Sequence, residues 1–191
     1  MTIFKIAQIG HPALRDKARW ITEDPHELGA AVALLDDLTQ TMREYGGVGL
    51  AAPQVRVRIR AFVVEVAASE RYPDRGLQPL LRVINPTVTA LTEEREVGWE
   101  GCLSIAGLLG RVPRFKAVSL EGLDARGEPM RMELEGFAAI VVQHEYDHLE
   151  GIVFLDRMPD MSSLMAEEEY RRMQEREREQ RDAIGEAGGA D

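Results

Sequence analysis

The sequence predicts an α+β fold, in which mainly antiparallel strands pack around a buried central helix and further helices lie toward each end. Segments rich in β-branched residues follow one another in the middle of the chain without alternating helices, which disfavours parallel βαβ units. Apolar segments of helical character lie before and after them. We expect one domain over residues 1–160, a charged helix of the same domain over 161–184, and a disordered tail over 185–191.

The composition is that of a globular protein with an acidic surface. A chain of 191 residues suits one domain, and Lys plus Arg number 23 against 33 Asp plus Glu, a net charge of −10. This balance argues against broad electrostatic binding to nucleic acid. No apolar run reaches the roughly 20 residues that span a bilayer, and the N-terminus lacks the layout of a signal peptide and indicates no organelle. We therefore expect a cytoplasmic protein without membrane association.

The first helix is predicted over residues 25–45. Asp24 is suited to cap it, Pro25 to occupy its first position, and Gly46 and Gly47 to end it. The following segment GVGLAAPQV is expected to be a loop because of its glycines. The apolar residues at helical spacing are Leu28, Val32, Leu35, Leu38 and Met42.

Strands are predicted over residues 58–66 and 80–88, which are β-branched and bounded by turn-forming residues. Residues 115–136 alternate between apolar and polar on either side of the stretch 124–129, so they predict a hairpin with its turn there.

Two later segments switch to helical periodicity. Residues 137–151 predict a helix that ends near Gly151 and is buried almost all round, because its first six residues are apolar. Residues 162–184 predict a charged amphipathic helix, followed by the tail GEAGGAD.

The buried helix carries the pattern H-E-x-x-H, with His144 and His148 one turn apart and Glu145 beside the first. The two imidazoles lie about 40° apart around the axis, so they face the same side. A divalent cation would satisfy such a pair, and the glutamate could act as a base. The alternative is two core histidines that hydrogen-bond to their neighbours.

Two residues compete as third ligand on the sequence alone. Glu168 stands about 20 residues downstream, as in a thermolysin-like metallopeptidase, but consecutive glutamates make that match easy to obtain by chance. Cys102 is the only cysteine, which excludes an internal disulfide, and its thiolate would be a strong ligand for Fe²⁺ or Zn²⁺. Spacing does not choose between them.

The residues that flank these positions distinguish between the two candidate ligands. The segments GVGLAAPQV (47–55), EGCLS (100–104) and QHEYDHLEG (143–151) resemble, in the same order, the three signature motifs of the peptide deformylase family. The resemblance extends to PALR, NP and VPR and covers residues 10–158. It implies that residues 1–160 are a deformylase-like catalytic domain.

The resemblance implies a metal site and its chemistry. Cys102, His144 and His148 would hold one divalent metal ion, natively Fe²⁺, with Zn²⁺, Ni²⁺ or Co²⁺ as substitutes and a water in the fourth position. That water would attack the formyl group of N-terminal formylmethionine on nascent polypeptides and release formate. Glu145 would be the general base and acid, while the Gln54 side chain and the Leu103 N–H would stabilise the oxyanion.

The resemblance also implies how the substrate is held. Gly49 would let an extended peptide approach and pair as an added strand. Glu100 is grouped with the substrate-binding residues, and we expect it, with Arg114, to orient the motif segments. Asp147 is expected to accept a hydrogen bond outside the ligand shell. The apolar pocket for the methionine side chain would consist of Val48, Phe137, Ile140 and Val141.

Some residues depart from the family pattern. Ala106 and Gly107 stand where a proline is common, and Gly98 and Trp99 are less usual, so the loop expected beyond Cys102 and the side-chain preference are in doubt. In the family the terminal helix can contact the ribosome. For residues 162–184 that contact is a hypothesis, and a solvated helix with internal ion pairs is favoured. A metallopeptidase that uses Glu168 and a ribosome-associated protein without activity are the competing function classes.

Overall fold

The structure is a computed structural model that describes residues 2–66 and 77–187, with side chains up to residue 181. Every strand pairing is antiparallel, and a single-residue bridge between Arg19 and Ile59 is the one parallel contact in the described part. The first sheet has the order β1-β2-β3-β6-β7, with β1 Gly49–Ala51, β2 Ala61–Val66, β3 Gln78–Ala90, β6 Ala117–Leu123 and β7 Pro129–Glu135. The second has the order β4-β5-β8, with β4 Arg95–Cys102, β5 Ile105–Phe115 and β8 Met165–Ala166.

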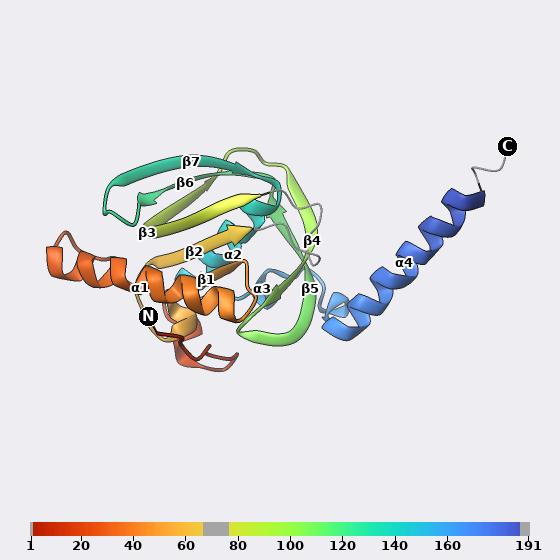
Figure 1. Cartoon of the computed structure of the whole chain (residues 1–191), viewed down its shortest axis with the longest axis horizontal. Coiled ribbons are helices and arrows are strands. Elements are labelled where there is room, and N and C mark those ends of the chain that lie inside the picture. Colours follow the sequence, from red (N-terminus) through yellow and green to blue (C-terminus); the bar gives the residue numbers. More distant parts are fainter. Residues whose placement is uncertain (1, 67–76, 188–191) are drawn as a thin grey trace.

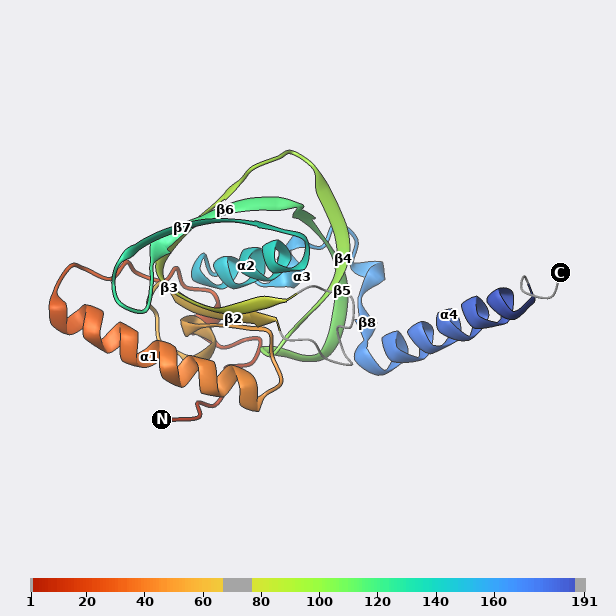
Figure 2. The ribbon, with the colours of Figure 1, turned by 45° about the horizontal axis from the view of Figure 1, so that its top comes forward.

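Helix α2 lies in the space that the two sheets enclose (Figures 1 and 2). It spans Gly136–Leu149, and the side chains on all its faces from residue 139 to 149 are buried except Tyr146, which is partly buried. Its apolar side chains pack against β2, β3 and β6 in one core cluster. The predicted α+β fold with a buried H-E-x-x-H helix is therefore confirmed.

Helix α1 (Pro25–Glu44) packs on the opposite face of the first sheet (Figure 2). The Asp24 carboxylate accepts a hydrogen bond from the His26 N–H at 2.9 Å, which caps the helix as predicted. Gly46 has φ +65°, and the next N–H, that of Gly47, donates to the Met42 carbonyl. This left-handed glycine ends the helix where the sequence indicated.

Two predictions about loops were wrong. The segment 47–55 contains strand β1 and the 3₁₀ helix η2 (Ala52–Val55) rather than a loop. The stretch beyond Cys102, expected to be a loop, forms β5, which pairs with β4 along nearly its whole length. The glycines in β1 and β5 suggest a break in regular structure when the sequence is considered alone. In the fold, hydrogen bonds from the neighbouring strands β2 and β4 hold these segments extended.

The C-terminal segment starts later than predicted. The 3₁₀ helix η3 (Met161–Ser163) and β8 come first, and α4 then spans Glu167–Ala187. The expected tail at 185–191 is thus helical to residue 187, and its last four residues lie outside the described part. The remaining short elements are η1 Pro12–Leu14 and α3 Phe154–Arg157.

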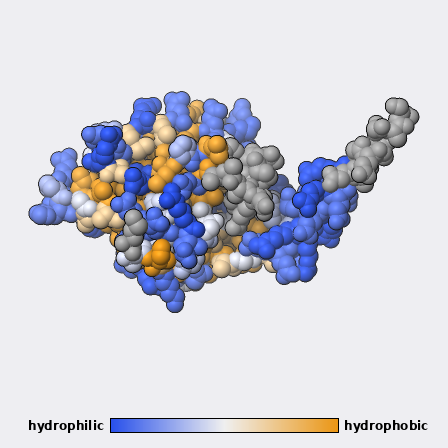
Figure 3. Space-filling view, in the orientation of Figure 1, coloured by the Kyte–Doolittle hydropathy of each residue, from blue (hydrophilic) through white to orange (hydrophobic). Residues whose placement is uncertain are grey.

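Helix α4 projects away from the body of the protein and has a hydrophilic surface (Figures 1 and 3). Its first turns are attached through β5 and β8, and Tyr170 contacts the Trp99 ring of β4 with 5.3 Å between centroids. Over residues 2–66 and 77–187, we find no helix with both the length and the apolar character to traverse a bilayer.

Candidate active site

Three side chains from distant parts of the chain meet at the centre of the protein. Helix α2 supplies His144 and His148, and the end of strand β4 supplies Cys102. The Cys102 Sγ lies 3.3 Å from His148 Nε2, and one ligand atom from each of the three residues lies within 4.8 Å of the others. One thiol and two imidazoles are the donors that Fe²⁺ and Zn²⁺ prefer, so the residues fit the metal ion that the sequence implied.

Hydrogen bonds behind His144 fix its ring. Its Nδ1 lies 2.8 Å from the buried Glu100 carboxylate, which leaves Nε2 for a ligand role. Arg114 binds Glu100 through two nitrogens, at 2.7 and 2.9 Å, and Asp147 through a third at 2.6 Å. Arg157 of α3 also donates to Asp147. Glu100 therefore binds both His144 and Arg114, and Asp147 accepts hydrogen bonds from Arg114 and Arg157.

These surroundings set the charges of the site. Burial opposes ionisation of Glu100, but hydrogen bonds from Arg114 and His144 lower its pKa to about 2. Burial lowers the pKa of His148 well below its usual value, so this ring is neutral and able to bind a cation at pH 7. Burial also opposes the cationic form of His144, yet the Cys102 sulfur and the Glu100 carboxylate raise the pKa of His144 well above its usual value. A metal ion would have to displace that proton.

Glu145 lies between the ligands and strand β1. Its side chain is buried, and burial raises the pKa of Glu145 to about 7. Its Oε2 has no hydrogen-bond partner among the described residues. On the other side, a Cβ added at Gly49 would lie 2.3 Å from Oε1, so only glycine leaves room for this carboxylate. The geometry places a buried carboxyl group beside β1, which is the last strand of the first sheet among the described residues.

Gln54 is aimed at the same point from η2. Its Oε1 accepts the Ala51 N–H at 2.8 Å, which orients the amide so that Nε2 points to Cys102 Sγ at 3.6 Å and to Ser104 Oγ at 3.3 Å. The side chain is fully buried, which is unusual for a glutamine. Leu103 follows the cysteine directly, and its side chain packs against the backbone of Gly47. All three sequence motifs therefore meet at one place.

Three of the four proposed pocket residues, Val48, Phe137 and Val141, belong to or border the core cluster around α2, whereas Ile140 is buried outside it. Val48 precedes β1, and Phe137, Ile140 and Val141 stand on α2 one to two turns before His144. Ile140 and Val141 are buried, while Val48 and Phe137 are partly buried beside the same cluster. The arrangement suits an apolar pocket but also suits ordinary core packing.

Glu168 does not join this group of ligands. It lies on α4 with a largely exposed side chain and pairs with Arg172 at 2.5 Å. In the structure Glu168 is therefore not placed to be the third ligand of a metallopeptidase. The residue that lies beside His144 and His148 is Cys102.

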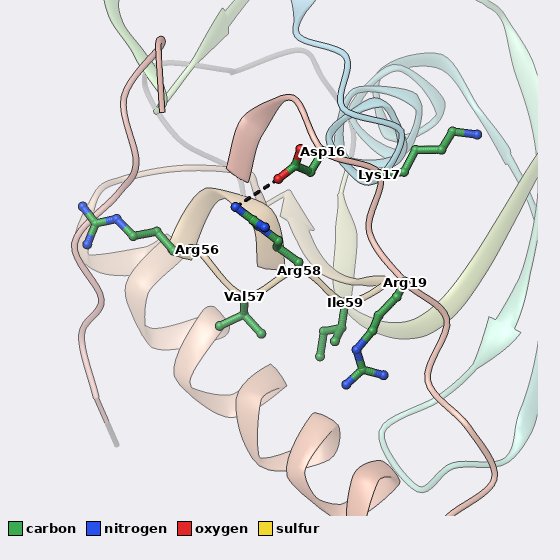
Figure 4. A pocket seen from close by; sticks show the side chains of 7 residues that line it. All are labelled: Asp16, Lys17, Arg19, Arg56, Val57, Arg58 and Ile59. Atoms are coloured by element: carbon green, nitrogen blue, oxygen red, sulfur yellow. Dashed lines mark ion pairs between the residues drawn. The ribbon is translucent and has the colours of Figure 1, made fainter. Parts of the chain in front are cut away.

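A surface groove elsewhere is lined by charged residues but contains none of the predicted site residues. Figure 4 shows that its cationic side chains do not converge: Arg58 pairs with Asp16 at 3.0 Å, and Lys17 and Arg56 point away in different directions. The groove therefore lacks the converging cationic side chains that an anion-binding site needs.

Sequence reasoning missed two residues that contribute to the site. Ser104 meets the Gln54 amide, and its N–H donates to Cys102 Sγ at 3.4 Å. Arg157 is the second arginine, after Arg114, that binds the Asp147 carboxylate. Ser104 lies inside a recognised motif, but Arg157 is one arginine among many and nothing in its spacing distinguishes it.

An α+β domain that gathers a thiol, two imidazoles and a buried carboxylate belongs to the class of candidate metallohydrolases. Comparison with known proteins identifies the family. Residues 3–163 match the family model described as polypeptide deformylase, and the chain belongs to that family. The prediction of a deformylase-type hydrolase is thereby confirmed.

Individual relatives match over most of their length. The chain is 39% identical over 171 residues to peptide deformylase 2 of a Nostoc species, covering 90% of this chain and 94% of that protein. It is 47% identical over 139 residues to peptide deformylase 2 of Pseudomonas putida, covering 72% and 78%. Among solved structures, the Met-Ala-Ser-bound class I type b peptide deformylase of Acinetobacter baumannii has a TM-score of 0.76 at 34% identity, covering 82% of this chain and 99% of that one.

Proposed function

We propose that this chain removes the N-formyl group from formylmethionine at the N-terminus of nascent polypeptides and releases formate. The observation that carries the proposal is the convergence of Cys102, His144 and His148 with the carboxylate of Glu145, in a chain of the deformylase family. A relative with the same fold binds Met-Ala-Ser, which has the form of a deformylated product.

We infer that one divalent metal ion, Fe²⁺ in the cell, is held by the Cys102 sulfur and the two imidazoles. Such an ion supplies Lewis acidity, which makes a water molecule acidic enough to attack near pH 7 and polarises a carbonyl. The Cys102 sulfur and one nitrogen of each imidazole would be the ligands, and the Glu100 carboxylate keeps the His144 ring oriented for this role.

Glu145 takes the proton from the attacking water and passes it to the leaving amine. The support is its position: one oxygen has no partner among the described residues, and burial keeps its pKa close to the working pH. A carboxyl group that titrates near pH 7 can both accept and return a proton.

Gln54 and the Leu103 N–H are proposed to stabilise the negative charge that develops on the formyl oxygen. The Gln54 amide is oriented by its bond to the Ala51 N–H and has its NH₂ group directed at the metal-ligand cluster before substrate arrives. Such preorganised donors need no reorientation during the reaction, which is why they lower the barrier.

The peptide is proposed to add as a strand along β1. Within residues 2–66 and 77–187 this strand ends the first sheet and has β2 as its one paired neighbour, so its other edge is proposed to accept a substrate backbone. Gly49 brings that edge close to Glu145, and the methionine side chain enters between Val48 and the start of α2.

Formate release from formyl-Met-Ala-Ser by the purified, metal-loaded protein tests the proposal. We expect catalytic formate production, inhibition by a chelator, and restoration by added divalent metal. Metal binding without formate release would contradict the proposed reaction. Hydrolysis of an internal peptide bond instead would favour a metallopeptidase.

A further inference from the structure

The face of α2 turned away from the metal ligands is held by a buried arginine. Tyr146 stands about 200° from His144 around the helix axis, so its ring faces away from the site. The Arg60 guanidinium carbon lies 5.1 Å from the centroid of the Tyr146 ring and 4.7 Å from that of Trp20. Arg60 Nη1 also binds the Glu150 carboxylate at 2.7 Å, and the residue is only 3% exposed.

This contact is made where α2 most needs support. His148 lies in the last turn of the helix, which ends at Leu149 with Glu150 as its C-cap. The last carbonyls of a helix lack partners within the helix, so its final turn frays unless other groups hold it. Here the Ala18 N–H donates to the Leu149 carbonyl at 2.8 Å, and Arg60 places its positive charge at the negative end of the helix dipole.

Arg60 also connects this helix end to the segment that carries Gln54. It stands six residues after Gln54, directly before β2, and its N–H donates to the Arg19 carbonyl at 2.9 Å. The Arg19 N–H donates in turn to the Arg58 carbonyl. The backbone around Arg60 is therefore fixed independently of its side chain, so the guanidinium is a rigid support for the end of α2.

We propose that Arg60 is a positioning residue for the active site, which keeps the last turn of α2, and with it His148 and Glu145, in register with Gln54 and Cys102. It touches neither substrate nor ligands and acts through Tyr146 and Glu150. A change in kcat on a formylated peptide tests this role only if the proposed deformylation is correct, whereas changes in Zn²⁺ transfer and in the Co²⁺ spectrum test it independently of that reaction.

Loss of a buried ion pair lowers stability in any case, so the test needs measurements that stability alone would not change. Arg60→Met keeps the aliphatic bulk and removes the guanidinium, while Arg60→Lys keeps the charge but not the planar group that lies against the rings. Arg58→Met is the matched control, because Arg58 stands two residues earlier and its exposed side chain pairs with Asp16. All measurements are made well below the melting temperature of each variant.

For Arg60→Met we expect transfer of bound Zn²⁺ to a chelator about tenfold faster, or more, than in the unsubstituted protein. We expect an altered visible absorption spectrum of the Co²⁺ form, and a kcat on formyl-Met-Ala-Ser about 10- to 100-fold lower at saturating metal with KM within about twofold. Arg60→Lys should fall between, and Arg58→Met should match the unsubstituted protein.

A lower melting temperature with unchanged Co²⁺ spectrum, Zn²⁺ transfer and kcat would overturn the proposal and leave Arg60 a purely structural residue. Should Arg60→Met not fold, Arg60→Lys and Trp20→Leu carry the test, and unchanged spectra and rates in both would overturn it. If the unsubstituted protein binds Zn²⁺ but releases no formate, the proposed function fails, while Zn²⁺ transfer still decides the role of Arg60.

Discussion

At the scale of single residues, the environment of Glu145 combines burial, one oxygen against the Gly49 backbone and one oxygen without a partner among the described residues. A buried carboxylate left unpaired is costly, and such groups are kept where they react. Its neighbour His144 is by contrast fixed through Nδ1. The structure therefore places a carboxyl group with one unpartnered oxygen next to a ring that is held by a hydrogen bond.

Glu145→Gln is expected to lower kcat by about 10²- to 10⁴-fold, because the amide keeps the shape of the side chain but no longer accepts the proton. The variant should still bind metal, since Glu145 is not among the ligands. Formate assays and metal analysis of the same preparation check both statements. Activity within about tenfold of the unsubstituted protein would exclude Glu145 as the base.

Gly49→Ala tests the close approach of β1 to this carboxylate. The added Cβ would lie 2.3 Å from Oε1, so the Glu145 side chain or the strand must shift. We expect a loss of about 1–3 kcal/mol of stability and a kcat at least about tenfold lower. Gly98→Ala is the control, because its Cβ meets nothing within 4 Å. Equal behaviour of the two variants in unfolding and formate assays would refute the steric argument.

The three donor side chains that the structure brings together were predicted from the sequence, which specified only part of their surroundings. H-E-x-x-H and a lone cysteine specify donor atoms, and only the resemblance selected Cys102 over Glu168. The link from His144 through Glu100 to Arg114 depends on a strand pairing that no local pattern encodes. Long-range hydrogen bonds of this kind follow from the fold and not from spacing.

At the scale of elements, the helices were predictable because their caps and periodicity are local. Helix α1 begins at Pro25 and ends one residue before the predicted Tyr45. Strand β4 was not predicted and a loop was expected where β5 lies; both strands contain glycines, which are depleted in strands. Strand propensity depends on the partner strand more than on the residue, so such segments are recognised only once they are paired.

The contact between α1 and β2 gives a pH prediction. Arg43 at the end of α1 binds both Glu65 oxygens at 2.7 Å, and these hydrogen bonds lower the pKa of Glu65 below its usual value. The unfolded chain then binds more protons, so the pair stabilises the fold above the unfolded pKa of about 4.3 and this contribution is lost as pH falls through the folded pKa.

Denaturant unfolding of the unsubstituted protein and of Glu65→Gln measures this contribution. We expect a difference of about 0.5–1 kcal/mol at neutral pH, because both side chains are partly exposed. The difference should shrink toward zero near pH 3. A difference that stays constant over this range would show that the charge of Glu65 is not responsible.

At the scale of the whole molecule, the protein is a closed body with a projecting helix (Figure 1). The body contains every residue of the proposed site, whereas α4 carries its own ion pairs, such as Arg171 with Glu167 and Arg172 with Glu168 and Glu169. Acidic residues outnumber basic ones along α4, which disfavours contact with RNA but leaves contact with a protein open to test.

A chain ending at Gln174 keeps the Tyr170 contact and removes most of the projecting helix. We expect kcat/KM on formyl-Met-Ala-Ser within about twofold of the full chain, since no site residue is removed. A tenfold fall would show that α4 contributes to catalysis. Ribosome co-sedimentation of both chains is the second measurement, and equal association of the two would exclude docking through the removed part of α4.

The most direct measurement is X-ray absorption spectroscopy of the Zn²⁺-loaded protein at one metal per chain. The structure predicts one sulfur ligand at about 2.3 Å and two imidazole nitrogens at about 2.0–2.1 Å, with the sulfur signal lost in Cys102→Ala and kept in Glu168→Ala. A metal shell without sulfur, or one that loses a ligand in Glu168→Ala, would contradict a centre built from Cys102, His144 and His148.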